Sequence, residues 1–459
     1  MYLMTFIDIL VIIIFVIILN SPVSTKLKKK IILVEKEVIG EINCIYDIKD
    51  TTKTVKIFGN EFKKESEFDL YINEEKINYI KEYKFKTIGK NIIRIDLYQD
   101  LNMDYMFKDV TNLTSVELKT NHNCKIISMI STFENCIYFY NFNISKFDLE
   151  QVKSMRKLFY NTSLITFSFS SLNTKNLEDI SYMFAESRIK ELSLNNFITN
   201  KVINMSHLFE GCYYLSSIDL STFETNEVKD MSYMFNYCAY LRNLDLSNFK
   251  TKKVNNMSYM FQNCNHLEEI IFENFDTSQV TDMRYMFSYA YSLTSIDLSK
   301  FNTSNVKNMA YMFSQCFNLY NLDLKSFDTS KVTDMSYMFQ YCIRIENIDL
   351  SIFNTSNVIN MNSMFSAMKS LKSLDLSNFD TSKVTDMDSM FIDLNKLENI
   401  NLKNFNTKNV INMKNMFFAC RLITSLDLSD FNTEKVKYMS NMFTNCEKLN
   451  YIKISSFKT

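Results

Sequence analysis

The chain has 459 residues, of which 46% are hydrophobic, and a formal net charge of −1 at pH 7. The hydrophobic content is enough for a large core, and the near-zero charge excludes a global field that would attract nucleic acid or a membrane surface. The length alone predicts about three domains, but the repeat described below favours one continuous solenoid over residues 103–459.

Residues 2–19 form an almost wholly apolar run in which Asp8 is the only charge. The length of the run fits either a signal peptide or a membrane-spanning helix, so residues 1–30 are predicted to be one of the two. A signal peptide has basic residues before its apolar run, whereas here they follow it, at Lys26, Lys28, Lys29 and Lys30. By the positive-inside rule this lysine cluster would hold the rest of the chain in the cytoplasm. The sequence therefore indicates membrane targeting and leaves open both cleavage and topology.

Residues 31–102 do not repeat and are predicted to form a small β-rich cap. Alternation of apolar and polar residues in Phe68–Ile72 and Lys90–Leu97 indicates half-buried strands. Three of the four glycines lie in this segment, where tight turns between strands need them. A cap is expected here because the open end of a solenoid would otherwise expose its core.

From Met103 onward the chain repeats a unit of 26 residues, and two steps are shortened to 25. One phenylalanine marks each of fourteen copies: Phe107, Phe133, Phe159, Phe184, Phe209, Phe235, Phe261, Phe287, Phe313, Phe339, Phe365, Phe391, Phe417 and Phe443. Such a period predicts stacked supersecondary units, since no single unit can bury its apolar residues. Residues 103–459 are therefore predicted to be a leucine-rich-repeat solenoid of fourteen coils.

Each repeat unit has two halves. The first half, LxxLxLxxF as in Leu241–Phe249, matches the strand of a leucine-rich repeat. The second half, TxxVxxMxxMFxxC as in Thr251–Cys264, has apolar spacings of three and four, which predict a short helix or 3₁₀ segment on the outer side. An Asp or Asn before the first Met, such as Asp334, is expected to cap that helix. We therefore predict an α/β repeat with a parallel inner sheet, helical outer segments, the β-rich cap and an N-terminal hydrophobic helix.

Two further columns of residues, meaning positions that recur in successive repeat units, have structural interpretations. A threonine recurs where the chain leaves the strand, and its hydroxyl is predicted to pair with buried backbone groups of the turn. Eight of the ten cysteines stand three residues after the repeat phenylalanine, in a column that elsewhere accepts Ala, Ser or Thr. These cysteines are therefore predicted to be reduced, buried packing residues rather than disulfide partners.

The sequence contains no motif of a catalytic or metal site. The three histidines, His122, His207 and His266, have no partner motif, and no phosphate-binding loop, nucleophile elbow, HExxH or CxxC spacing occurs. We therefore expect no enzyme activity, metal or cofactor, and neither nucleic acid nor a small-molecule substrate as a partner.

Two columns are candidate binding surfaces. The middle residue of LxL is expected on the concave face, as an acidic stripe for a basic protein segment or weak cations, or as a solubilising residue copied by duplication. About 5 Å apart, these carboxylates are expected to raise one another's pKa. The stripe consists of Asp219, Asp245, Asp297, Asp323, Asp349, Asp375 and Asp427. A tyrosine stripe on the outer segment is expected to bind a partner or to cover apolar surface. It consists of Tyr233, Tyr259, Tyr285, Tyr311 and Tyr337.

Two stretches, LDLSNFDTSKVTDM (Leu374–Met387) and TDMSYMFQYC (Thr333–Cys342), carry a resemblance to a known family. They resemble the 26-residue leucine-rich repeat of the BspA-like surface-protein group, with the consensus LxxLDLSxFxTxxVxxMxxMFxxC, and the resemblance covers residues 103–459. It implies a solenoid displayed at a cell surface that binds a host or matrix protein, without catalytic residues. The expected function is non-catalytic cell-surface binding or adhesion, and an intracellular scaffold anchored by residues 2–19 is the alternative.

Overall fold

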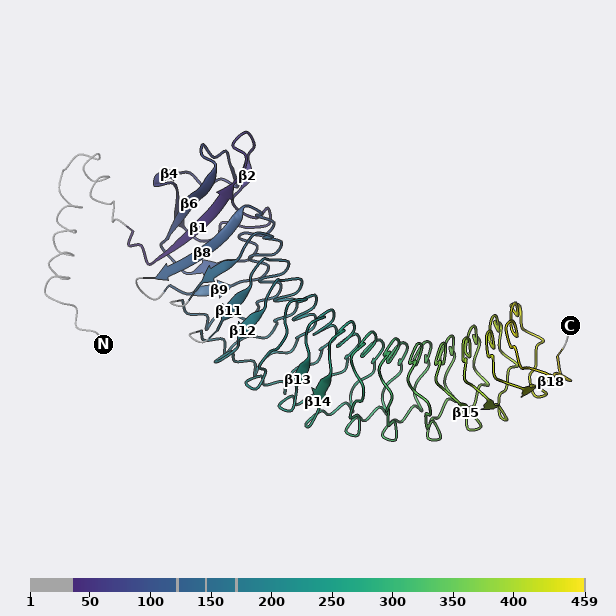
Figure 1. The fold of residues 1–459 in the computed structure, drawn as a ribbon. Helices are drawn as coiled ribbons and strands as arrows, with labels where there is room; N and C mark the ends of the chain where they lie inside the picture. Colours follow the sequence, from purple (N-terminus) through teal and green to yellow (C-terminus); the bar gives the residue numbers. More distant parts are fainter. Residues whose placement is uncertain (1–35, 121–123, 145–146, 170–171, 458–459) are drawn as a thin grey trace, which may run out of the picture.

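The computed structural model describes residues 36–120, 124–144, 147–169 and 172–457. It shows a curved stack of coils with a β-sheet at its N-terminal end (Figure 1). Residues 2–19, for which the sequence predicts a signal peptide or a membrane helix, lie outside the described residues. Across the described ranges, no helix is long and apolar enough to cross a bilayer.

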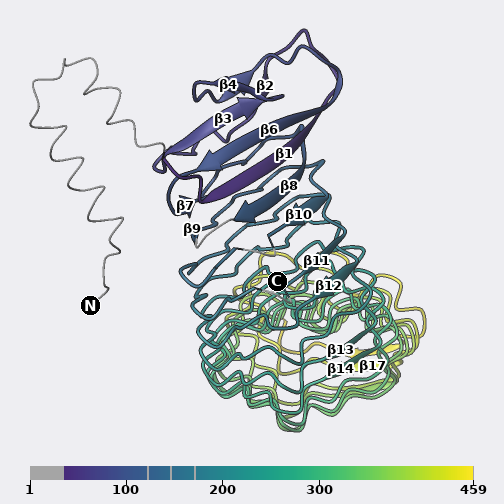
Figure 2. The ribbon, with the colours of Figure 1, turned by 90° about the vertical axis from the view of Figure 1, so that its left-hand side faces the viewer.

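The N-terminal sheet has six strands in the order β10-β8-β1-β6-β3-β4. Their bounds are β1 Gly40–Ile48, β3 Phe68–Ile72, β4 Glu75–Ile77, β6 Gly89–Leu97, β8 Leu113–Thr120 and β10 Asn141–Asn143. Alternate residues of β1 are buried, as the pattern of a half-buried strand predicts. Because β8 belongs to the first repeat and pairs in parallel with β10, the sheet runs from the N-terminal segment into the solenoid (Figure 2). Two short pairs flank this sheet: β2 (Val55–Lys56) with β5 (Glu82–Tyr83), and β7 (Leu101–Asn102) with β9 (Ile126–Ser128).

The strands of the solenoid are three residues long and pair in parallel two by two. Their bounds are β11 Thr166–Ser168, β12 Glu191–Ser193, β13 Asn243–Asp245, β14 Glu269–Ile271, β15 Ser373–Asp375, β16 Asn399–Asn401, β17 Ser425–Asp427 and β18 Tyr451–Lys453. In β13 the middle residue, Leu244, is buried and both neighbours are exposed. The predicted strand register is therefore confirmed.

The predicted helical outer segments are wrong, because the second half of the coil contains no helix in the part of the chain that the structure describes. Backbone N–H groups there alternate between two directions. The N–H of Tyr233 donates to the carbonyl of Ser258 in the next coil at 3.0 Å, whereas that of Met234 donates to Met231 at 3.3 Å. Tyr233 and Tyr237 have φ values of 59° and 58°, which a right-handed helix cannot contain. A chain of β-turns thus produces the same apolar spacing as a helix.

Asp334 does not cap a helix but closes a turn on a parallel ladder. Its Oδ1 accepts the N–H of Ser336, two residues on, at 2.9 Å. Its backbone bridges to Asn308 and Asn360 in the two neighbouring coils. Equivalent bridges follow one another without a gap from Ser154 to Tyr438. This ladder on the turn side is more continuous than the strand pairing on the other side, where the pairs β11–β12, β13–β14, β15–β16 and β17–β18 are separate.

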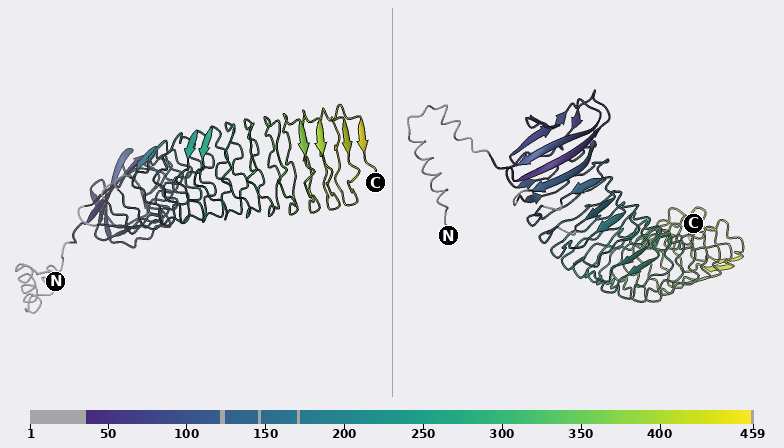
Figure 3. Two further views of the ribbon diagram at one scale, coloured as in Figure 1. Left: turned by 90° about the horizontal axis from the view of Figure 1, so that it is seen from below. Right: turned by 60° about the vertical axis from the view of Figure 1, so that its left-hand side comes forward.

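The strands lie on the convex face, so the prediction of an inner sheet is also wrong. Figure 1 shows the solenoid strands along the outer edge of the curve and the turns along its inner edge, and the view from below in Figure 3 faces the strands. The spacings of aromatic rings between two neighbouring coils agree with this placement of the strands on the convex face. The centroid distance is 4.6 Å for Tyr259–Tyr285 on the turn side, 5.6 Å for Phe261–Phe287 in the core and 6.2 Å for Phe275–Phe301 after the strand. The coils are closest on the turn side because the unbroken hydrogen-bond ladder holds them there.

The threonine and cysteine columns occupy their predicted places. The buried Thr329 donates its hydroxyl to the carbonyl of Asn354 at 3.0 Å and accepts the N–H of Asn354 at 2.8 Å, which confirms the hydroxyl ladder. All ten cysteines are free, and of the eight in the predicted column seven are buried, whereas Cys446 is half-buried. Burial raises the pKa of the Cys212 and Cys316 thiols to about 12, so these thiols stay protonated at neutral pH.

Candidate binding surfaces

The acidic stripe lies on the convex face rather than on the concave face that the sequence predicts. All seven aspartates are exposed, each directly after an apolar residue of the strand segment that is buried in the core or packs against it. Ile271 and Asn401 stand in the same column and interrupt the stripe. The error concerns curvature alone: the alternation correctly predicts that these side chains point outward.

Each carboxylate of the stripe is held by a local turn. Oδ1 of Asp297 accepts the N–H of Ser299 at 2.9 Å, and this bond lowers the pKa of the Asp297 carboxyl. The pKa of Asp427 falls to about 2, because the hydroxyl and N–H of Ser429 and the ammonium of Lys453 all donate to its carboxylate. The expectation that neighbouring carboxylates raise one another's pKa is therefore wrong for these members. Hydrogen bonds from the turn outweigh repulsion across well-solvated surface.

Asn401 shows which part of the aspartate the turn requires. Its Oδ1 accepts the N–H of Lys403 at 3.3 Å, in the same manner as the aspartates. A neutral amide thus closes the turn, and Ile271 occupies the column with an apolar side chain. The fold needs at most an oxygen acceptor at this position, so the negative charge of the other members is not a structural requirement.

The tyrosine stripe is part of a longer aromatic stack on the concave face. Neighbouring centroids are 4.0–4.6 Å apart and the ring planes lie within 10° of parallel. The members are Tyr182, His207, Tyr233, Tyr259, Tyr285, Tyr311 and Tyr337. His207 also approaches Glu210, with 2.6 Å between Nδ1 and Oε2. Since each ring covers the face of the next, a partner reaches only the ring edges and hydroxyls.

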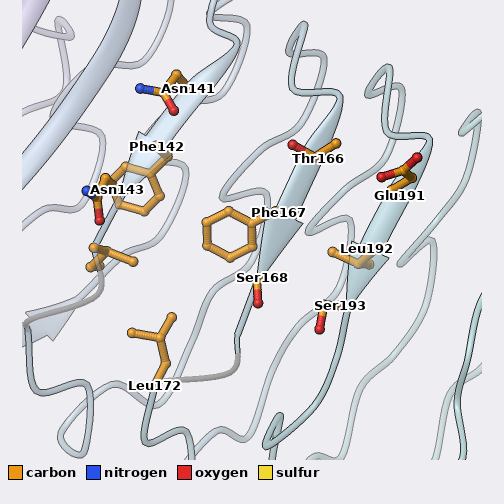
Figure 4. Close-up of a pocket in the computed structure, with 11 residues that line it drawn as sticks. Asn141, Phe142, Asn143, Thr166, Phe167, Ser168, Leu172, Glu191, Leu192 and Ser193 are labelled. Atoms are coloured by element: carbon orange, nitrogen blue, oxygen red, sulfur yellow. The ribbon is translucent and has the colours of Figure 1, made fainter.

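A hollow on the strand side is a feature that sequence reasoning missed. Its volume is about 630 Å³, and it lies across β10, β11 and β12 (Figure 4). Its exposed side chains are Asn141, Asn143, Thr166, Ser168 and Glu191. One sequence feature could have indicated this hollow. In the first coils the aspartate column holds the neutral residues Asn143, Ser168 and Ser193. The described residues contain no group of three His, Cys, Asp or Glu side chains that would hold a metal ion.

Comparisons with known proteins place the chain in a family of repeats. A search of curated proteins gives no match. A crystal structure of a leucine-rich repeat protein from Eubacterium ventriosum is similar over 71% of this chain and 82% of that chain, with 14% identity and a TM-score of 0.31, which is too low to support a structural argument. One family model matches residues 78–196, 186–271, 265–374 and 367–459. The chain therefore belongs to the family described as "Mycoplasma protein of unknown function, DUF285", and its repeats form a solenoid without helices in the described residues.

Proposed function

We propose that this chain is a non-catalytic binding protein that recognises a basic segment of a protein ligand through the acidic stripe. The observation that carries the proposal is the excess of negative charge in a column where Asn401 closes the same turn without charge. The carboxylates are exposed and held in place by the N–H of a following residue, as in Asp219 and Asp349. A row of fixed charges loses little conformational entropy on binding and steers an oppositely charged partner.

The surface location is the second part of the proposal. We propose that the solenoid is displayed outside the cell and binds a host or matrix protein, as the resemblance to the BspA-like group implies. The alternative is a membrane-anchored intracellular scaffold, which Lys26, Lys28, Lys29 and Lys30 favour. Protease treatment of intact cells separates the two, because an external solenoid is digested and an internal one is protected until the cells are lysed.

The stripe is tested by reversing three of its central charges. In D297K/D323K/D349K the turn loses its carboxylate acceptors, but the exposed column tolerates other side chains, as Ile271 shows. The full chain and this variant are used as paired bait for matrix proteins, and the proteins that only the native chain retains are titrated against both in solution. Loss of binding by at least tenfold, together with a steep decline with salt, is expected.

The matched control changes the same charge elsewhere on the same or neighbouring coils. Asp276, Asp328 and Asp380 each accept the N–H of a serine two residues on at 2.9 Å, as the stripe residues do, but lie beside the threonine ladder. The variant D276K/D328K/D380K has the same net charge as the stripe variant and is expected to bind like the native chain. Equal binding by a folded stripe variant, or equal losses in both variants, would contradict the assignment of the stripe.

A further inference from the structure

The strand side is interrupted between β10 and β11. β10 pairs with β8 and β11 pairs with β12, and in the described residues no pairing joins β10 to β11. The hollow of about 630 Å³ lies at this interruption. Its size is within the range of ~300–1,000 Å³ that is usual for small-molecule sites. The interruption thus opens a shallow site at the N-terminal end of the convex face.

The hollow is too narrow to accept an added β-strand. The rings of Phe142 and Phe167, on the two strands that flank the break, are stacked at 6.0 Å with an angle of 12° between their planes. A strand inserted between two others would require them to stand about 10 Å apart, twice the spacing of paired strands. An occupant therefore lies on top of the strands instead of between them.

The lining combines a polar rim with an apolar floor. Figure 4 shows Asn141, Thr166 and Glu191 side by side on successive strands, with Phe142, Phe167 and Leu192 in the next row. The amide of Asn141 donates to the hydroxyl of Ser115 at 2.8 Å, which fixes its orientation.

The charge of the lining excludes two classes of ligand. It contains Glu191 but no Lys, Arg or His, so a phosphate or sulfate group would meet repulsion without a compensating cation. A single carboxylate is also too few ligands for a bound calcium ion. The mainly uncharged amide and hydroxyl groups of the lining, beside its apolar residues, fit a neutral ligand with both hydroxyl groups and apolar surface.

We propose that this hollow binds a neutral sugar. The amide, hydroxyl and carboxylate groups of the rim match the alternating donors and acceptors of adjacent sugar hydroxyls. Below the rim, the half-buried Leu192 and the small exposed parts of Phe142 and Phe167, whose rings pack into the core, supply apolar surface for the C–H face of the sugar ring. This site lies outside the acidic stripe and is independent of the protein ligand proposed above, because the strand column is neutral here.

The test uses saturation-transfer NMR on the full chain with D-glucose, D-galactose, D-mannose and N-acetyl-D-glucosamine, each at millimolar concentration. Transfer from the protein to at least one sugar is expected, and inorganic phosphate is expected not to compete. Glu191→Ala removes a charge-assisted hydrogen bond and is expected to weaken binding of that sugar about ten- to hundredfold. Thr166→Val, which keeps the shape of the side chain, is expected to weaken it severalfold.

A control variant is available in the same column. Glu269 occupies the first position of β14 as Glu191 does in β12 and is likewise exposed, but it does not line the hollow. Glu269→Ala and the stripe variant D297K/D323K/D349K are both expected to bind the sugar like the native chain. The proposal is overturned by the absence of transfer to every sugar, by competition from phosphate, or by equal binding in folded E191A and E269A variants.

Discussion

Replacing Thr329 by valine tests whether the hydroxyl ladder stabilises the solenoid through its hydrogen bonds or only through its packing. Valine has the shape of threonine, so the substitution removes two hydrogen bonds, to the N–H and the carbonyl of Asn354, and leaves the volume unchanged. A buried backbone group without a partner costs ~1–3 kcal/mol. Since Asn354 itself is exposed, water partly replaces the lost bonds, and we expect a total of about 2 kcal/mol.

Thr329→Ser separates the two explanations. Serine keeps both hydrogen bonds and loses one methyl group, which costs about 1 kcal/mol. Equilibrium unfolding in urea, with hydrogen exchange at Asn354 as a local probe, should therefore rank the native chain above T329S and T329S above T329V. Thr333→Val is the control. The hydroxyl of Thr333 also donates to a neighbouring coil, at 3.1 Å, but Thr333 is exposed whereas Thr329 is buried. The reasoning is refuted if T329V is as stable as T329S, since packing would then dominate.

Three further predictions follow from the aromatic stack, the thiols and the acidic stripe. Tyr285→Ala should destabilise the chain by about 1 kcal/mol more than Tyr337→Ala in urea unfolding, because Tyr285 stacks on Tyr259 and Tyr311 whereas the stack ends at Tyr337; equal losses would contradict this, since the two residues share φ values of 58° and 59°. In the native state the half-buried Cys446 should react with a thiol reagent before the nine buried cysteines, and Cys446→Ser should remove the fast phase. The pKa of Asp427 in the folded chain is lowered to about 2, so its ionised form stabilises the fold above pH 3.8, the ordinary pKa. This stabilisation is lost as the pH falls from 3.8 to about 2. ¹³C NMR of labelled aspartate measures the pKa of Asp427, and Ser429→Ala should raise it.

The sequence alone determined the period of the solenoid and the burial of its columns. A side chain repeated at one position of every coil packs against its equivalents in the neighbouring coils. The types of Phe339, Thr329 and Cys342 are therefore those that stack well or satisfy buried polar groups. The same reasoning correctly assigned the outward residues of LxL, because alternation along a strand is a local property.

Only the tertiary structure decided the form of the turn half and the direction of curvature. Apolar spacings of three and four suit a helix, and they equally suit successive β-turns in which every second N–H group pairs with the next coil, as in Met231–Cys238. Curvature depends on the difference between coil spacings on the two sides, which no single coil encodes. The hollow between β10 and β11 likewise arises from a break in pairing between coils. Properties within one repeat were therefore predictable, whereas those set by how neighbouring repeats stack were not.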